Sequence, residues 1–406
     1  MVRSASAPRA YLDHAATTVL RPAAREAYLE ASTLHGNPSS THAAGRSVRA
    51  VLDSALEEIA SLLDVPRSWL LLTSGGTEAD NLALRAVPQA LRAADPSRTA
   101  VAVAATDHPA VLATARSLAV PAGGTGADGT GADGFAVREL GVDARGVLDP
   151  AGVAAALEDR AVGLLSAALV NNETGAVQDL AALGEAARAH GTLLHTDAVQ
   201  AVGHIPLPRR GEVDLMSLSG HKLGAPVGVG VLVARPGVPF APLSTGGGQQ
   251  RDIRSGTLDA PHAAAFAAAL RETLAEAEET SARLAALTAR LRAGIAAIDP
   301  TARFTLPEDA PRAGHILHLL FPGAHADSLL FLLDERGVDC SAGSACSAGV
   351  LQASPVLAAM GVDEVAARGA LRLSLGWTST EQDVEIFLAA LPEALERARA
   401  VGALMR

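Results

Sequence analysis

Lys222 is the only lysine in a chain of 406 residues, and it stands in the segment SGHK (219–222). The sequence has 33 lysine and arginine residues, so the other 32 are arginines. A lysine amine with a lowered pKa can form an imine with an aldehyde, whereas a guanidinium is effectively never deprotonated. A lone lysine can also persist by chance in a composition rich in Ala, Gly and Arg. The neighbouring motifs must decide between these two interpretations.

Polar residues also follow other apolar runs of strand length. His108 follows VAVAAT, Asp197 ends TLLHTD with Gln200 three residues later, and Lys222 follows DLMSLS. Each residue alone is more often structural than catalytic. Because doubly wound sheets bind ligands at the carboxyl ends of their strands, we expect His108, Asp197 and Lys222 to meet there.

A possible phosphate site lies in TSGGTEADN (73–81), which follows the run WLLLTS. Gly75, Gly76 and Thr77 offer backbone N–H groups and a hydroxyl at a helix N-terminus, although the same pattern also suits an ordinary helix cap. A phosphate needs such a terminus, an aldehyde needs a lysine, and a protonated ring nitrogen needs a carboxylate. Pyridoxal 5′-phosphate has all of these groups.

Helical and strand-like segments alternate from about residue 47. Strands that are apolar on both faces and separated by helices predict a mostly parallel sheet covered on both sides. We expect a large α/β domain at 21–260, and a smaller α+β domain formed by 1–20 and 261–406. The repeat GTGADGTGADG (124–134) contains G-x-G-x-x-G twice, but a strand-like run follows it where a dinucleotide site needs a helix. We interpret it as a surface loop insertion.

Composition excludes several classes of protein. A net charge of −11 and an aromatic content of 3% argue against a nucleic-acid surface. No apolar run reaches the roughly 18 residues of a membrane span, and the N-terminus lacks the apolar segment of a signal peptide. Two cysteines form no disulfide framework and suit a reducing cytoplasm, and no Cys/His spacing matches a metal site.

Several motifs occur in the order seen in class V pyridoxal-phosphate enzymes. They are YLDHAATT, GNPSSTHAAGR, TSGGTEADNLAL, TDHPAV, NNETGAVQ, HTDAVQAVG, SGHK, GGGQQRDIRSGT and CSAGSAC. From about residue 11 to 380 the chain resembles these enzymes, and most closely the cysteine desulfurases of the IscS/NifS type with an SGSAC loop. The resemblance implies a fold-type I transferase, with a large domain built on a mostly parallel, seven-stranded-type sheet.

The resemblance also implies a role for each cofactor-binding residue. Lys222 holds pyridoxal 5′-phosphate, and Asp197 pairs with its ring nitrogen, which makes the ring a better electron sink. His108 stacks on the ring and serves as an acid or base. The other implied contacts are Gln200 with the ring hydroxyl, Asn172 with the cofactor, and Gly76, Thr77, Ser219 and His221 with the phosphate.

Substrate and dimer contacts follow from the same resemblance. Arg372 in LRLSLG binds the substrate carboxylate with a forked guanidinium. Asn172 and Asn37 position the substrate. Thr257 reaches the phosphate of the neighbouring subunit, which implies a homodimer with shared sites.

Both cysteines lie in CSAGSACSAG (340–349), within a loop expected at about 338–352 that carries the catalytic cysteine. The resemblance implies that the Cys346 thiolate attacks the sulfur of bound L-cysteine, becomes a persulfide, and leaves alanine as product. An iron–sulfur scaffold, a tRNA-thiolating enzyme or a DNA-sulfur pathway then receives the sulfur. Cys340 follows a strand-like run, and we interpret it as structural.

The sequence departs from the family pattern in four places: Ser347, Gln250, Trp377 and the 121–134 insertion. None of them removes a catalytic group, but they leave the acceptor and the dimer surface open. The alternatives are a selenocysteine lyase, a class V aminotransferase, and a non-catalytic scaffold. The cysteine loop argues against an aminotransferase, and the presence of Lys222, Asp197 and Cys346 argues against a scaffold.

Overall fold

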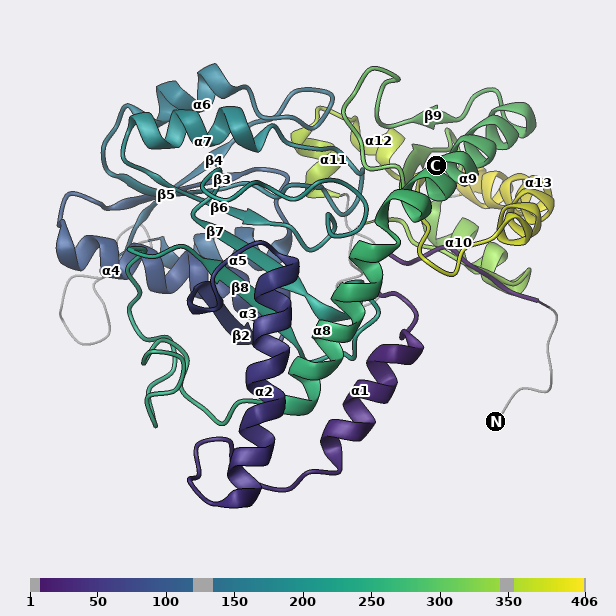
Figure 1. Ribbon diagram of the computed structural model, residues 1–406. Coiled ribbons are helices and arrows are strands. Elements are labelled where there is room, and N and C mark those ends of the chain that lie inside the picture. The colour runs from purple at the N-terminus through teal and green to yellow at the C-terminus, as the bar shows by residue number, and fades with distance from the viewer. Residues whose placement is uncertain (1–7, 120–133, 344–353, 405–406) are drawn as a thin grey trace.

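The computed structural model describes residues 8–119, 134–343 and 354–404. A seven-stranded sheet forms the centre of the larger part (Figure 1), and all of its strands are parallel except β8. In spatial order the strands are β2 (Leu70–Thr73), β8 (Gly230–Ala234), β7 (Leu215–Ser219), β6 (Leu193–Asp197), β5 (Val162–Ser166), β3 (Ala100–Ala104) and β4 (Ala136–Leu140). This arrangement confirms the mostly parallel sheet expected from the sequence.

Helices cover both faces of this sheet, which explains why its central strands are apolar throughout. On β3, Val101 and Val103 belong to one apolar core, while Ala100, Ala102 and Ala104 belong to the other. The core on the valine side is closed by α3 (Gly76–Asn81), α4 (Val87–Ala94) and α5 (Pro109–Leu118). The opposite core is closed by α2 (Ala43–Leu62), α6 (Pro150–Leu157), α7 (Leu180–Ala189) and α8 (Ala260–Ala275).

The helical segment that begins at Gly76 is not a regular α-helix throughout. Between α3 and α4 the chain forms a π-helical stretch at Leu82–Ala86. Pro88 follows directly within α4, and its ring nitrogen has no hydrogen to donate back to the preceding turn. A wider turn next to this proline accommodates the missing hydrogen bond.

The smaller part has a core of its own. Its antiparallel sheet has the order β12 (Ala370–Ser374), β10 (Ile316–Leu320) and β9 (Arg303–Phe304), and β1 (Ala10–Tyr11) pairs with β11 (Val338–Asp339). Its helices are α9 (Ala277–Ile298), α10 (Ala326–Glu335), α11 (Pro355–Ala359), α12 (Glu364–Ala367) and α13 (Glu381–Leu404). No helix in the described ranges is long and apolar enough to cross a membrane.

The two cores indicate where the chain changes domain. Phe266 and Leu270 of α8 lie in the core of the large sheet, whereas Leu284 and Leu291 of α9 lie in the core of the smaller part. We therefore propose a boundary between α8 and α9, somewhat later than the residue 260/261 boundary expected from the sequence.

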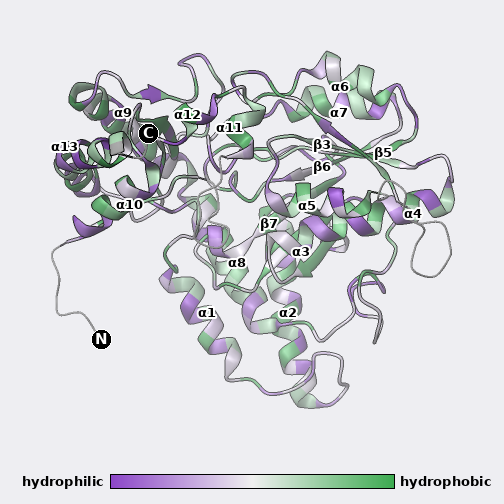
Figure 2. Cartoon of the chain, turned by 180° about the vertical axis from the view of Figure 1, so that it is seen from behind, coloured by the Kyte–Doolittle hydropathy of each residue, from purple (hydrophilic) through white to green (hydrophobic). Residues whose placement is uncertain are grey.

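Helix α1 (Pro22–Ser32) and α2 extend away from the sheet, and both helices are banded in hydrophilic and hydrophobic colours (Figure 2).

Candidate active site

The carboxyl ends of the parallel strands surround a cavity of about 220 Å³, called the Lys222 cavity below. Strands β2, β3, β5, β6 and β7 each lead directly into a segment that contributes to its wall. The structure thus brings together most of the residues singled out in the sequence, which are Gly76, Thr77, His108, Asn172, Asp197, Gln200, Ser219, His221 and Lys222.

Lys222 ends a short 3-10 turn that follows β7. Its Nζ donates hydrogen bonds to the carbonyl oxygens of Ala15, at 2.5 Å, and Ala16, at 2.6 Å. Burial, together with the positive charge of Arg372, lowers the pKa of this amine to about 8. The amine therefore loses its proton far more readily than an ordinary lysine, as imine chemistry requires.

Asp197 ends β6, and its Oδ1 accepts a hydrogen bond from the backbone N–H of Val199 at 2.8 Å. Asp80 and Asp107 are buried nearby, and burial raises the pKa of all three carboxyl groups, that of Asp107 to about 8. Within the described ranges, Oδ1 of Asp80 and Oδ2 of Asp107 have no hydrogen-bond partner. Asp80 and Asp197 line the cavity, and two buried carboxyl groups with so few donors suit a cationic N–H donor there.

The turn before α3 forms another wall of the cavity. Gly75 has φ +153°, a conformation that favours glycine, and a Cβ on Gly76 would lie 2.9 Å from Cγ2 of Val199. Glu78, in the first turn of α3, fixes this turn because its carboxylate accepts a hydrogen bond from the backbone N–H of Ser74. The same carboxylate pairs with Arg254 at 2.8 Å. Backbone N–H groups at the beginning of a helix, held rigidly in this way, suit a phosphate.

His108 is the N-cap of α5, and its Nδ1 accepts a hydrogen bond from Ala110 N–H at 3.1 Å. This contact fixes the ring and leaves Nε2 for a ligand. Burial lowers the pKa of His108, so the ring is neutral and able to take up a proton. Gln200 donates from Nε2 to Ala15 O at 2.9 Å, and His221 Nδ1 lies 3.2 Å from Oγ1 of Thr17.

Arg372 lies on β12 beside the Lys222 cavity, although it does not line it. Its side chain is buried, with Nη1 donating to Asn172 O at 2.8 Å and Nη2 pairing with Asp13 at 2.7 Å. Its Nε has no partner in the described part of the chain. A buried guanidinium with an unused donor next to the cavity suits an incoming carboxylate.

Sequence reasoning assigned no role to Asp13, Ala15 or Ala16. The Asp13 side chain pairs with Arg372. The carbonyl oxygen of Ala15 accepts hydrogen bonds from Gln200 and Lys222, and that of Ala16 accepts one from Lys222. The motif YLDHAATT, which contains all three, was a visible signal.

Three predicted residues lie elsewhere. Asn37 is exposed between α1 and α2, where its Oδ1 accepts from Ser39 N–H at 2.8 Å, and Thr257 is also exposed; neither lines the Lys222 cavity of its own chain. For Thr257 this agrees with a role in a neighbouring subunit, which stays a prediction. Cys346 lies outside the described residues.

Cys340 and Gln250 have structural surroundings. Cys340 packs against the core of the smaller part, and burial strongly raises the pKa of its thiol, so it remains protonated. Gln250 uses both ends of its amide on the peptide group of Leu72, accepting from N–H at 2.6 Å and donating to the carbonyl at 2.8 Å. This double contact explains why an amide, which can donate, serves here better than the glutamate of the family pattern.

Taken together, these groups match the chemistry of pyridoxal 5′-phosphate. A deprotonatable amine, a buried carboxylate, a fixed imidazole and a helix N-terminus surround one cavity. The fit rests on the donor set and on the unpaired carboxyl oxygen of Asp80, which lines the cavity.

Comparison with known proteins gives the family of this chain. The family model for class-V aminotransferases matches residues 10–387. The chain belongs to this family. It is 42% identical to an IscS-like cysteine desulfurase from Mycobacterium tuberculosis over 96% of this chain and 97% of that protein. It is 40% identical to a cysteine desulfurase from Cereibacter sphaeroides, with 97% of each chain covered.

The fold comparison agrees as well. A solved structure of a NifS-like protein superposes with a TM-score of 0.84 at 31% identity, covering 96% of this chain and all of the other. These findings confirm the fold class and the resemblance seen in the motifs.

Proposed function

We propose that this protein is a cysteine desulfurase that converts L-cysteine to L-alanine and passes the sulfur to Cys346. One observation supports this most strongly. The sole lysine, with a pKa lowered to about 8, shares a single cavity with Asp197 and His108. The relatives named cysteine desulfurases, at 40% and 42% identity over nearly the whole chain, support the choice of substrate.

The bound cofactor supplies an electron sink that labilises bonds at the substrate Cα. Lys222 would hold the cofactor, and its neutral amine would take the proton from the substrate Cα. Asp197 keeps the cofactor's ring nitrogen protonated, because a buried carboxylate favours a cation beside it. His108, neutral and fixed through Nδ1, moves a proton at Nε2. Arg372 binds the substrate carboxylate, and its neighbour Asn172 helps to position the substrate.

The described chain on either side of Cys346 supports its role as the sulfur acceptor. A Cβ on Gly343 would lie 3.4 Å from Oε2 of Glu173, and Ser354 Oγ donates to the same oxygen at 2.5 Å. Glu173 directly follows Asn172 in the sequence, and Asn172 lines the Lys222 cavity. Cys346 is three residues beyond Gly343, and three residues span at most about 11 Å. The described chain thus leads into and out of the segment that contains Cys346 beside Glu173, the residue that follows Asn172 of the cavity wall.

The transfer step is a nucleophilic displacement at sulfur. The Cys346 thiolate attacks the substrate sulfur, the new S–S bond forms, and the substrate C–S bond breaks. The electron pair of the broken bond and one proton remain with the carbon fragment, which leaves as alanine. A reductant or an acceptor protein then removes the sulfur from Cys346.

The wider setting is part of the same proposal. We expect a cytoplasmic homodimer in which Thr257 of one subunit, exposed in the single chain, acts at the site of the other. An iron–sulfur scaffold protein or a tRNA-thiolating enzyme is the expected sulfur acceptor.

The test uses the full chain with a limiting amount of L-cysteine, which is itself a thiol, and no other reductant, followed by mass analysis of the cysteine peptides. We expect one added sulfur atom on Cys346, released as sulfide when a thiol is added. Cys340→Ser is the matched control and should retain the product, while Cys346→Ser should lose it. Sulfur found only on Cys340 would refute the assignment. Alanine formed from selenocysteine but not from cysteine would favour a selenocysteine lyase.

A further inference from the structure

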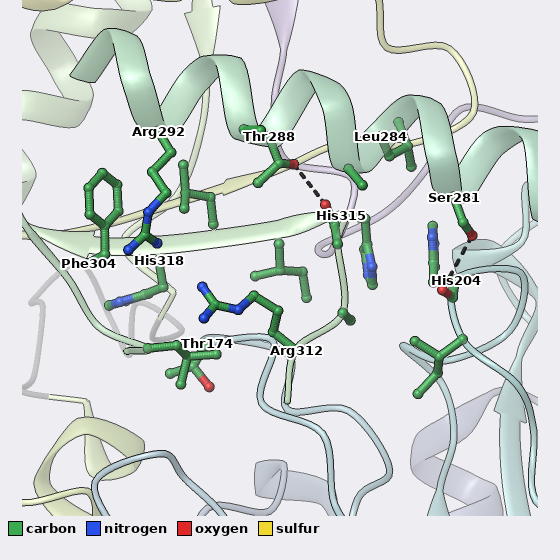
Figure 3. Close-up of a pocket in the computed structure, with 18 residues that line it drawn as sticks. Thr174, His204, Ser281, Leu284, Thr288, Arg292, Phe304, Arg312, His315 and His318 are labelled. Atoms are coloured by element: carbon green, nitrogen blue, oxygen red, sulfur yellow. Dashed lines mark hydrogen bonds between the residues drawn. The ribbon is translucent and has the colours of Figure 1, made fainter. Parts of the chain in front are cut away.

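A second cavity, of about 470 Å³, lies along one face of α9 and shares no lining residue with the Lys222 cavity. We call it the α9 cleft (Figure 3). One wall is the α9 face from Ser281 to Arg292, the second is β10 with the segment before it, and the third comes from Thr174, His204 and Ile205 of the large domain. From Ser281 to Arg292 the helix rises about 16 Å, so the cleft is elongated.

Positive charge gathers at one end of the α9 cleft. Arg292 and Arg312 lie there with Phe304, and the guanidinium of Arg292 stacks 4.0 Å from the centre of the phenyl ring (Figure 3). Arg292 makes no hydrogen bond with the described residues, and its nearest carboxylate, that of the exposed Glu308, is 3.9 Å away. Burial and the charge of Arg312 both lower the pKa of Arg292. Arg312 donates hydrogen bonds to the carbonyl oxygens of Ala310, at 3.3 Å, and Pro307, which hold its guanidinium but leave its charge unpaired within the described residues. Two guanidinium groups that line one cleft, with a single exposed carboxylate at 3.9 Å, attract an anion.

Apolar side chains also line the cleft, and the end opposite Arg292 is polar. The apolar residues include Leu284, Leu306 and Ile316. At the far end the rings of His315 and His204 stack, with centroids 3.5 Å apart. His315 is only 2% exposed, and neither of its ring nitrogens has a partner among the described residues. A buried imidazole without a partner is costly unless a ligand or water completes it.

We propose that the α9 cleft binds a medium-chain carboxylic acid, with its carboxylate on Arg292 and Arg312 and its chain directed toward His315. The charge at one end fits the carboxylate, and the apolar side chains of the lining fit the hydrocarbon chain. The unpartnered imidazole of His315 fits a hydroxyl at the end of that chain. This binding is independent of the proposed desulfurase reaction.

Calorimetric titration of the full chain with decanoate, ω-hydroxydecanoate and decanol tests the proposal. Measurement at two temperatures prevents a vanishing heat from hiding binding, since apolar burial changes the heat capacity. We expect ω-hydroxydecanoate to bind at least as tightly as decanoate, and decanol to bind about tenfold more weakly or not at all. Equal binding of decanol and decanoate, or no heat with any probe at both temperatures, would overturn the proposal.

Variants locate the binding on the molecule. Arg292→Gln should weaken decanoate binding about tenfold or more, whereas Arg290→Gln, which removes a charge on the same helix outside the cleft, should not. Ala285→Trp fills the cleft and should abolish binding, while the exposed neighbour Ala286→Trp, outside the lining, should leave it intact. Unchanged affinity in both Arg292→Gln and Ala285→Trp would place the ligand elsewhere. Because binding is read directly, these outcomes hold whether or not the chain desulfurates cysteine.

Discussion

The lowered pKa of Lys222 predicts a specific pH dependence for cofactor capture. An amine with a pKa of about 8, in place of the ordinary 10.5, is about 9% neutral at pH 7, compared with about 0.03% for a free lysine. The lysine in the protein is thus about 300 times more often ready to react. Above about pH 11 both amines are mostly neutral and the difference disappears.

The assay mixes the cofactor-free chain with pyridoxal 5′-phosphate at a series of pH values and fixes the product with borohydride. Free acetyl-lysine amide in the same buffers is the reference, so the ionisation of the aldehyde reagent cancels. We expect the rate ratio of protein to free lysine to fall about 200-fold between pH 7 and 11. Since Lys222 is the only lysine, peptide masses assign the attachment without ambiguity.

A rate ratio that stays constant with pH would refute this reasoning, because it would give Lys222 the pKa of an exposed lysine. Lys222→Arg is the control and should show no attachment beyond the N-terminal amine.

Three further predictions concern single side chains. Gln250→Glu should lower the free energy of unfolding by about 1–3 kcal/mol, because a carboxylate cannot donate to the Leu72 carbonyl. Gln249→Glu is the control, since it keeps the one hydrogen bond that Gln249 accepts, from the backbone N–H of Gly256. In thermal denaturation the control should match the wild type. Asp197→Asn should reduce turnover at least 100-fold while Lys222 still captures the cofactor, and equal turnover would contradict the assigned role. His195 is fully buried and its pKa is lowered to about 3, so the folded protein takes up a proton there less readily than the unfolded chain. The free energy of unfolding should therefore fall by about 1.4 kcal/mol per pH unit as the pH drops from 6.5 toward 3. Urea unfolding at a series of pH values should show a weaker pH dependence of this free energy in His195→Gln.

The site could be anticipated from the sequence where each residue directly follows a strand. His108, Asp197 and Lys222 end or follow apolar runs, and parallel strands place such positions at one edge of the sheet. The contact between Arg372 and Asp13 could not be anticipated, because 359 residues separate them and no local pattern links β12 to the N-terminal segment.

Two other features were hidden for related reasons. Asp80 reads in the sequence as an ordinary acidic residue in a first helical turn, and only the packing of β6 and β7 shows it to be buried beside Asp197. The α9 cleft depends on a helix, a strand and a loop that meet only in the folded chain. The sequence periodicity predicts that residues from Ser281 to Arg292 form a helix, but it does not show which strand and loop pack opposite that helix to form the cleft.

The central claim is that Lys222 performs imine chemistry on cysteine, and one measurement tests it most directly. Alanine and sulfide released from L-cysteine in the presence of a reductant and pyridoxal 5′-phosphate are compared for the wild type and Lys222→Arg, with circular dichroism to verify that both are folded. The account predicts equal amounts of the two products from the wild type and neither product from the folded variant. Full activity in Lys222→Arg, or a wild type that releases no alanine, would contradict it.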